Sequence, residues 1–329
     1  MRNRFSLLVT AVLLAVSAFA GQYLSEQSRI SLLTCAPGSE LYSRYGHTAL
    51  RVQDPDNQLD VVFNYGIFDF NTDHFYWKFM RGETYYQLGI ESANAFFFGY
   101  AYNGRPVYEQ VLNLTLAQRQ SLFEALVVNY EPQNRYYLYN FVFDNCATRP
   151  YQLIKRTLGD SIISTYTGAE GQTYRNFLRH YTRPASWANF GINLLFGKRA
   201  DQPMHGEQRL FLPEELMFFL SEARLPDGTP VVSDEDIHPF EIQPVPWYAT
   251  WYLGIVILAI ALVAISIWDR HRGKLSWWVE IAMGIVYLAL LLIVGFLTFF
   301  SIHPLVGFGW RLLIIPAIHL CARLIYIIR

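Results

Sequence analysis

The residues best suited to chemistry in this sequence are a cysteine, Cys146, and a histidine far upstream of it, His47. Cys146 follows Asp144 and Asn145, two residue types that favour helix starts, so the sequence predicts a cysteine in a first helical turn. The positive end of the helix dipole and a nearby imidazole would both stabilise a thiolate there. The pair therefore has the parts of a thiol nucleophile and its base, which would suit acyl chemistry.

Other interpretations of both residues stay open from sequence alone. A cysteine such as Cys146 is often only a small buried apolar residue. In an oxidising compartment it could instead form a structural disulfide with Cys35, because Cys321 lies in an apolar C-terminal segment. The exported part would then be a non-catalytic module. His47 has the alternative of a hydrogen-bonded core residue in a strand, although Gly46 before it permits close backbone approach.

Other chemistries have weaker support in the sequence. The 8 histidines and 3 cysteines form no HxxxH or Cys-x-x-Cys pattern, so we expect no metal site. There is no G-x-S-x-G elbow, phosphate-binding loop or G-x-G-x-x-G motif, so we expect no cofactor. A formal net charge of -1 without a basic stripe predicts no nucleic-acid partner.

The N-terminal residues 1–20 are typical of a secretory signal peptide. Arg2 and Arg4 precede an apolar stretch over residues 5–19, and small residues around Ala20 suit a signal peptidase. We expect cleavage after Ala20, and the alternative is an uncleaved anchor helix. Either way, the following residues are predicted to be exported.

The C-terminal residues 247–329 are predicted to form a membrane domain of three helices. Residues 247–268 and 281–302 contain no charged side chain, and each is long enough as a helix to cross a hydrocarbon core of ~30 Å. The third segment, residues 305–327, is apolar but interrupted by arginine and proline. We expect it to span the membrane, and the alternative is a helix lying on the membrane surface.

The loop after the first of these helices orients the chain in the membrane. Its basic residues are Arg270, Arg272 and Lys274. Basic loops stay in the cytoplasm, so residues 21–246 are predicted to face the exported side.

The exported part is predicted to be an α+β domain over residues 21–222, with a linker rich in proline and acid over residues 223–246. Alternating apolar residues and turn signals predict strands over residues 47–53, 59–65, 83–90 and 105–112. Helical spacing and capping residues predict helices over residues 73–80, 115–130, 144–158 and most of 172–222.

Several motifs resemble those of known enzymes. The motifs are Thr34-Cys35-Ala36-Pro37-Gly38, Tyr45-Gly46-His47-Thr48-Ala49-Leu50-Arg51-Val52, Phe63-Asn64-Tyr65-Gly66 and Asp144-Asn145-Cys146. A histidine on an early strand with asparagine-cysteine opening a later helix resembles the circularly permuted NlpC-type papain-like fold, which includes lecithin:retinol acyltransferase. The motifs are most similar to those of the Lnb-type bacterial lipoprotein N-acyltransferases, which combine a periplasmic domain with a C-terminal membrane part.

This resemblance implies a permuted papain-like periplasmic domain followed by a transmembrane α-helical region, and it assigns roles to residues. Cys146 would take an acyl group as a thioester, with His47 as the base. Asn64, on the strand after the histidine strand, would hold the imidazole, and Asp69 is the fallback for that role. The family motif also includes Asn145 beside the nucleophile. The backbone N–H of Cys146 would stabilise the oxyanion.

The resemblance further implies a multi-pass protein of the bacterial inner membrane with its catalytic domain in the periplasm. A membrane phospholipid would be the acyl donor, and the expected acceptor is an amine, first of all the N-terminal cysteine of lipoproteins. The alternative is a membrane-tethered periplasmic cysteine peptidase or amidase acting on peptidoglycan. Both functions use the same cysteine and histidine, and the several membrane helices favour the lipid substrate.

Overall fold

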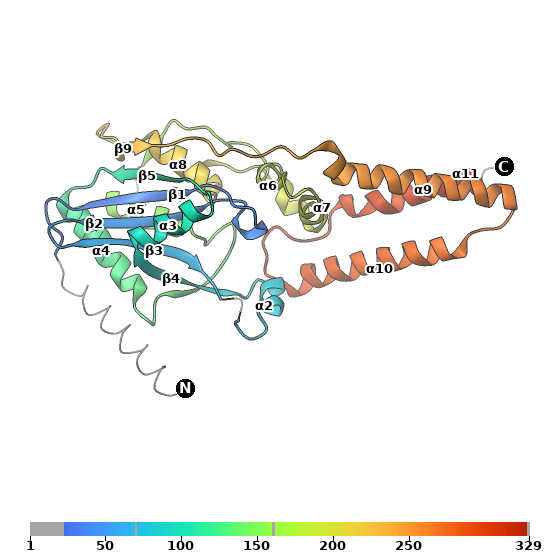
Figure 1. The fold of residues 1–329 in the computed structure, drawn as a ribbon, viewed down its shortest axis with the longest axis horizontal. Coiled ribbons are helices and arrows are strands. Elements are labelled where there is room, and N and C mark those ends of the chain that lie inside the picture. Colours follow the sequence, from blue (N-terminus) through green and yellow to red (C-terminus); the bar gives the residue numbers. More distant parts are fainter. Residues whose placement is uncertain (1–22, 70, 160–161, 328–329) are drawn as a thin grey trace. The chain divides into compact units, whose positions relative to one another are not determined.

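The computed structural model describes residues 23–69, 71–159 and 162–327, so the predicted signal peptide lies outside the described residues (Figure 1). The chain forms two compact units, and each is considered by itself. Unit 1 is built from the described residues of Met1–Phe79, Glu83–Glu170 and His205–Phe240. Unit 2 is built from those of Met80–Gly82, Gly171–Met204 and Glu241–Arg329.

Unit 1 is organised around a seven-stranded antiparallel sheet with the order β6-β4-β3-β2-β1-β5-β9. Its strands are β1 (Arg29–Cys35), β2 (His47–Asp54), β3 (Leu59–Ile67), β4 (Tyr85–Ser92), β5 (Val107–Leu112), β6 (Tyr136–Leu138) and β9 (Val232–Asp236). A small second sheet pairs β7 (Ile163–Ser164) with β8 (Ala223–Arg224). The four strands predicted from alternation are confirmed as β2 to β5.

Strand β1 lies inside this sheet, between β2 and β5, and is absent from the sequence prediction. Its residues from Ile30 to Cys35 are all buried. Ile30 and Leu32 belong to one core cluster, whereas Leu33 and Cys35 belong to another. Because protein covers both faces of the strand, it lacks the alternation of apolar and polar residues that marks a half-buried strand.

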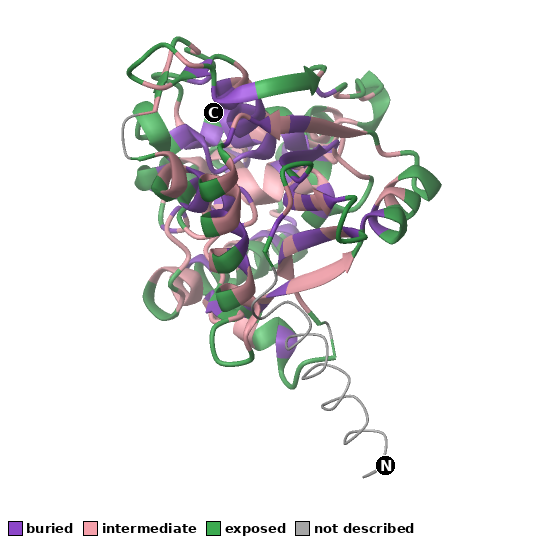
Figure 2. Cartoon of the chain, turned by 90° about the vertical axis from the view of Figure 1, so that its left-hand side faces the viewer, coloured by how far each residue is buried: buried purple, intermediate pink, exposed green. Residues whose placement is uncertain are grey.

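Helices cover both faces of the sheet, and buried residues gather on the strands (Figure 2). The larger core packs under α4 (Leu116–Tyr130), α5 (Thr148–Leu158) and α8 (Pro213–Ser221), and the smaller core packs under α3 (Ala93–Tyr102). Helix α4 begins at the predicted cap Thr115, which forms a capping box with Gln118. Shorter helices are η1 (Leu41–Ser43), η3 (Gly206–Arg209) and α2 (Phe75–Arg81), whose last residues belong to unit 2.

The predicted linker over residues 223–246 is wrong for its first part. Val231 and Val232 are buried, and β9 extends the sheet by pairing with β5. Unit 1 therefore continues to Phe240. The acidic composition suggested a tether because most residues of β9 are exposed at the edge of the sheet, where charged side chains are usual.

Unit 2 contains three helices that are long and apolar enough to cross a membrane. They are α9 (Trp251–Arg272), α10 (Trp277–Phe300) and a third stretch formed by η5 (Trp310–Leu313) and α11 (Ile314–Ile327). On α11, Arg323 forms ion pairs with Asp269 of α9 at 3.0 Å and with Glu280 of α10 at 2.6 Å. The arginine that interrupts the predicted third helix is therefore paired within the helix bundle.

Unit 2 also holds residues that the sequence analysis assigned to the exported domain. They form α6 (Tyr174–Thr182), α7 (Ser186–Leu195) and η2 (Lys198–Asp201), and a further turn, η4 (Trp247–Ala249), precedes α9. The predicted boundary at residue 222 differs from the structure because residues 171–204 pack with the three long apolar helices. A boundary made by packing between distant segments has no local sequence signal.

Candidate active site

His47 is the first residue of β2 and lies opposite Cys35, the last residue of β1. The preceding Gly46 has φ 77°, and a Cβ at this position would lie 2.8 Å from the carbonyl oxygen of Cys35 and 2.8 Å from the ring of Phe240. Only glycine permits this backbone conformation at such close approach. The turn at Gly46 therefore fixes the position of the His47 backbone, from which the imidazole extends.

Asn64 on β3 holds the imidazole of His47. Its Oδ1 lies 2.6 Å from Nε2 of His47, and its Nδ2 donates a hydrogen bond to Oε1 of Glu91 at 3.4 Å. Since the asparagine presents its oxygen to the ring, Nε2 carries the proton and donates it. This tautomer leaves Nδ1 of His47 as the basic nitrogen. The fallback residue Asp69 accepts hydrogen bonds from Asn71 in an exposed turn.

Cys146 lies just before α5, which begins at Thr148 and not at Asp144 as predicted. Residues Asn140 and Asp144 pair through their backbones and close a tight turn ahead of the cysteine, so the helix cannot start earlier. The backbone N–H groups of Thr48 and of Cys146 itself lie close enough to the sulfur to act on its pKa. The thiol therefore lies against the start of β2, next to His47.

Asn145 connects the cysteine to its surroundings through the backbone. Its Oδ1 accepts hydrogen bonds from the N–H groups of Ala147 at 2.8 Å and Thr148 at 2.9 Å, next to the start of α5. Its Nδ2 donates to the carbonyl oxygens of Phe141 and Phe211. With 2% of its surface exposed and its side chain bonded on both sides, Asn145 fixes the loop that carries the cysteine.

Gly66 on β3 marks the point at which the site residues meet. A Cβ at Gly66 would lie 3.5 Å from Cβ of Cys146, 3.7 Å from Cε1 of His47 and 4.0 Å from the hydroxyl of Tyr137. Gly66 has φ 91°, and the pairing of β3 with β4 shifts register here, so the strand bulges away. The structure thus brings Cys146, His47 and Asn64 together from three separate elements around a small space.

Tyr137 on β6 is a site residue that the sequence analysis missed. It is 5% exposed, and its hydroxyl oxygen is buried without a hydrogen-bond partner among the described residues. The guanidinium of Arg149 lies 3.6 Å from the centre of its ring. Burial raises the pKa of Tyr137 well above its usual value, so the hydroxyl stays protonated. Nothing in the local sequence distinguishes it from the neighbouring Tyr136 and Tyr139.

The surrounding protein keeps both the thiol and the imidazole neutral. Burial raises the pKa of Cys146 to about 11, against the lowering effect of the two backbone N–H groups. Burial lowers the pKa of His47 to about 4, although its hydrogen bond with Asn64 acts in the opposite direction. The thiolate expected at a helix start is therefore wrong for this resting state, because desolvation outweighs the local dipole. Both side chains remain partly accessible to a substrate.

The remaining cysteines and the metal-binding residue types form no competing site. Cys35, Cys146 and Cys321 are all free thiols in the structure. Cys35 is fully buried and forms a hydrogen bond with Tyr100 of α3. Within the described ranges, no group of three or more His, Cys, Asp or Glu side chains could hold a metal ion.

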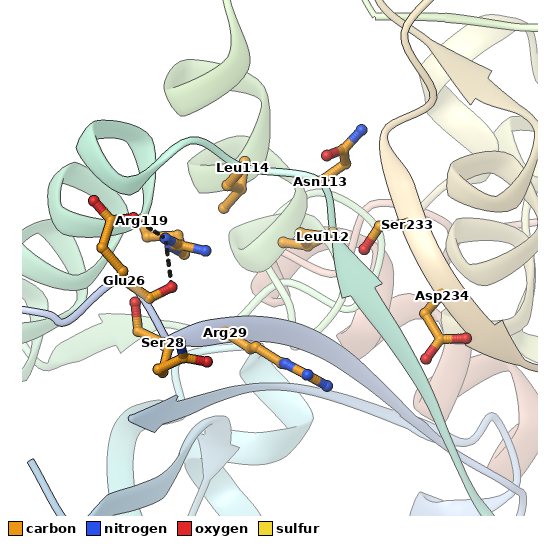
Figure 3. Close-up of a pocket in the computed structure, with 10 residues that line it drawn as sticks. Glu26, Ser28, Arg29, Leu112, Asn113, Leu114, Arg119, Ser233 and Asp234 are labelled. Carbon is orange, nitrogen blue, oxygen red and sulfur yellow. Dashed lines mark hydrogen bonds and ion pairs between the residues drawn. The ribbon is translucent and has the colours of Figure 1, made fainter. Parts of the chain in front are cut away.

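A polar pocket of about 410 Å³ lies elsewhere in unit 1 (Figure 3). Its lining includes Arg29, Arg119 and Glu26, and the last two form an ion pair at 3.8 Å. Arg29 begins β1, whereas His47 lies beside the other end of that strand. At ~3.3 Å per residue the length of β1 separates the two places by roughly 20 Å. The pocket is therefore distinct from the cysteine site.

The periplasmic part of this chain is similar to a known protein family. Residues 15–180, about half of the sequence, match the model of the Lnb N-terminal periplasmic domain. The chain belongs to the Lnb family. The matched region of this Lnb protein contains Cys146, His47, Asn64 and Tyr137. The family and the three candidate membrane helices together indicate a membrane protein with a periplasmic domain.

No curated protein and no solved structure matches the Lnb chain significantly. The residues that match the family model include strands β1 to β6 and helices α2 to α5. Cys146, His47, Asn64 and Tyr137 all lie within the matched residues, whereas Phe211 and Phe240, which pack around them, lie beyond residue 180.

Proposed function

We propose that this Lnb-family protein is a thiol-dependent acyltransferase of the bacterial inner membrane with a permuted papain-like periplasmic domain. The observation that supports it most is the convergence of Cys146, His47 and Tyr137 within 4.0 Å of one point above Gly66. A nucleophile, a base held by Asn64, and an unused hydrogen-bond donor around an open space are what acyl transfer through a thioester requires.

The first half-reaction forms an acyl-enzyme. Nδ1 of His47 takes the thiol proton while Sγ of Cys146 attacks the carbonyl carbon of a phospholipid ester. The carbonyl oxygen becomes an oxyanion, which accepts hydrogen bonds from the backbone N–H of Cys146 and from the hydroxyl of Tyr137. When the ester C–O bond breaks, His47 returns the proton to the leaving alkoxide. A lysophospholipid departs, and the acyl group stays on the sulfur as a thioester.

The second half-reaction moves the acyl group to an amine. The amine nitrogen attacks the thioester carbonyl, and His47 removes a proton from the nitrogen. The C–S bond then breaks, the proton passes to the sulfur, and an amide leaves the site with Cys146 restored as a thiol. A neutral imidazole suits this sequence because it can accept a proton in each half-reaction, and the lowered pKa of His47 keeps it neutral.

The choice of lipid and lipoprotein rests on the membrane part and on the family. Three helices able to cross a membrane keep the domain at a bilayer, where a phospholipid donor and a lipid-anchored acceptor are both concentrated. The N-terminal cysteine of a lipoprotein offers the amine. Asn64 and Asn145 are positioning residues in this scheme, because the first orients the imidazole and the second fixes the cysteine loop.

Intact-mass measurement of the protein purified from membranes tests the proposal. We expect a fatty-acyl adduct that neutral hydroxylamine removes, as a thioester requires, and we expect Cys146→Ala and His47→Ala to lack it. Cys35→Ala is the matched control, since it removes the other free thiol of unit 1, which is buried, and should keep the adduct. An adduct that persists in Cys146→Ala, or cleavage of peptidoglycan fragments by protein that never carries an adduct, would overturn acyl transfer.

A further inference from the structure

Unit 2 contains a basic segment that the proposed acyl transfer does not use. Residues 171–204 form α6, α7 and η2. The basic residues of this segment, besides histidine, are Arg175, Arg179, Arg183, Lys198 and Arg199, and its acidic residue is Asp201. The segment is therefore strongly positive for its length.

One end of this segment is attached to the start of α9. The backbone N–H of Trp251 donates a hydrogen bond to Oγ of Ser186 at 2.8 Å, and the rings of Phe190 and Trp251 lie 4.8 Å apart. The indole of Trp187 packs so closely on Gly254 that a Cβ there would lie 2.5 Å from it. Helix α7 thus lies beside the first turns of α9 (Figure 1).

The other end is attached to the chain that leads into the third membrane helix. Phe196 and Val306 form a β-bridge, and the N–H of Gly197 donates to the carbonyl oxygen of Leu305 at 2.9 Å. Arg311, in the first turn of the third helix, lies 3.4 Å from Asp201. Residues 198–201 are therefore beside the point where this helix begins.

Both attachment points lie on the periplasmic side of the membrane. The Lnb domain precedes α9 and is periplasmic, so α9 begins there, α10 returns there, and the third helix begins there again. Large aromatic side chains are exposed near these two helix starts: Trp187 57%, Trp247 74%, Tyr248 65% and Trp310 65%. Exposed tryptophan and tyrosine at helix ends are typical of the phospholipid head-group region.

Arg175 serves the fold of the segment itself. It is 1% exposed, forms an ion pair with Asp201, and donates to the carbonyl oxygens of Asn193, Phe196 and Gly197. The other cations of the segment lie at or near its surface, because Arg183, Lys198 and Arg199 are exposed and Arg179 is half-buried. Arg311, which follows outside the segment, is half-buried and shares Asp201 with Arg175.

These cations lie near the ends of the helices that are expected on the periplasmic side. The positive-inside rule concentrates Lys and Arg on the cytoplasmic side, so it does not account for a basic cluster at the periplasmic ends of the helices. Guanidinium and ammonium groups bind phosphate oxygens through charge-assisted hydrogen bonds. Between exposed aromatic side chains at the head-group level, the available phosphates are those of phospholipids.

We infer that Arg179, Arg183, Lys198, Arg199 and Arg311 form a head-group surface that binds anionic phospholipids of the outer leaflet. The phosphate groups contact these cations while Trp187 and Trp310 lie among the upper acyl carbons and glycerol. Lipid binding by this surface does not depend on the chemistry at Cys146, so the two proposals can be refuted separately.

Lipid selectivity of the full-length protein in vesicles tests the surface. Vesicles of phosphatidylcholine with increasing amounts of brominated phosphatidylglycerol quench nearby tryptophans, and the quenching gives the preference of the protein for the anionic lipid. We expect wild-type protein to prefer phosphatidylglycerol. The triple variant Arg183→Gln, Lys198→Gln, Arg199→Gln should lose about two-fold or more of that preference, because each removed cation weakens attraction to anionic lipid.

The matched control removes the same charge from unit 1 by changing exposed cations there: Arg29→Gln, Arg156→Gln and Arg224→Gln. This variant should keep the wild-type preference. Strong salt should reduce the preference of wild type toward that of the basic-segment variant, since screening acts on exposed charges. An unchanged preference in the basic-segment variant, or an equal loss in the control, would overturn the inference.

Discussion

Replacing Tyr137 by phenylalanine removes one oxygen atom and separates a catalytic role from a structural one. The hydroxyl of Tyr137 is buried without a partner among the described residues, so the folded protein already bears the cost of its desolvation. Deleting an unsatisfied buried polar group is neutral or stabilising, by about 1 kcal/mol at most. The ring remains in place under Arg149. Stability should therefore stay level or rise slightly.

Activity should change in the opposite direction. Loss of one oxyanion hydrogen bond typically lowers the rate of acyl transfer by about 10²-fold, which corresponds to ~2.7 kcal/mol of transition-state stabilisation. The rate of acyl-enzyme formation from a phospholipid, measured in a single turnover by intact mass, reports this step directly. Thermal unfolding of the same preparation in detergent reports the stability.

Tyr65→Phe is the matched control for this prediction. Tyr65 is a buried tyrosine whose ring lies 6.3 Å from that of Tyr137, but its hydroxyl accepts a hydrogen bond from Asn129 at 2.9 Å. Its loss should lower stability by about 1 kcal/mol and leave the rate unchanged. Our reasoning is refuted if Tyr137→Phe keeps the full rate, or if its rate falls only in proportion to a loss of folded protein.

Three further predictions concern the same site. Gly66→Ala places a methyl group in the space between the cysteine, the histidine and Tyr137, so acyl-enzyme formation should be abolished; Gly104→Ala, with φ 62° and open space around it, carries similar backbone strain and should remain active. The single-turnover rate should be level between the pKa of His47, about 4, and that of Cys146, about 11, and should fall as the pH drops through the lower value, because a protonated imidazole cannot accept the thiol proton. Stability should also fall below pH 6.5 in wild type but less in His47→Gln, because the unfolded chain then binds a proton that buried His47 does not.

The sequence predicted the elements that have one exposed side. Strands β2 to β5 alternate, and α4 carries a capping box, so both kinds of element have local signals. Strand β1 and helix α3 were missed because they do not. The first is buried on both faces, and the second presents consecutive phenylalanines, of which Phe96 is buried and Phe98 is 72% exposed. Which of them faces the sheet is decided by packing and not by periodicity.

The sequence predicted which residues of the candidate site lie together, but it missed the environment around them. Cys146, His47 and Asn64 were named from motif and strand order, and the structure brings them together. Their protonation follows from how much protein surrounds them, which depends on the complete fold. Tyr137 enters the site because β6 pairs with β4, and the pairing of a three-residue strand has no reliable sequence signal.

The ion pairs of Arg323 have a consequence for how the three long helices are held together. Arg323 on α11 is 5% exposed, and its partners Asp269 and Glu280 lie on the two helices that precede it in the chain. A buried charge is costly without its partner, so neutralising either carboxylate would leave the arginine incompletely compensated. The three helices are therefore coupled by charge as well as by apolar packing, and a change at one of these residues is felt by all three.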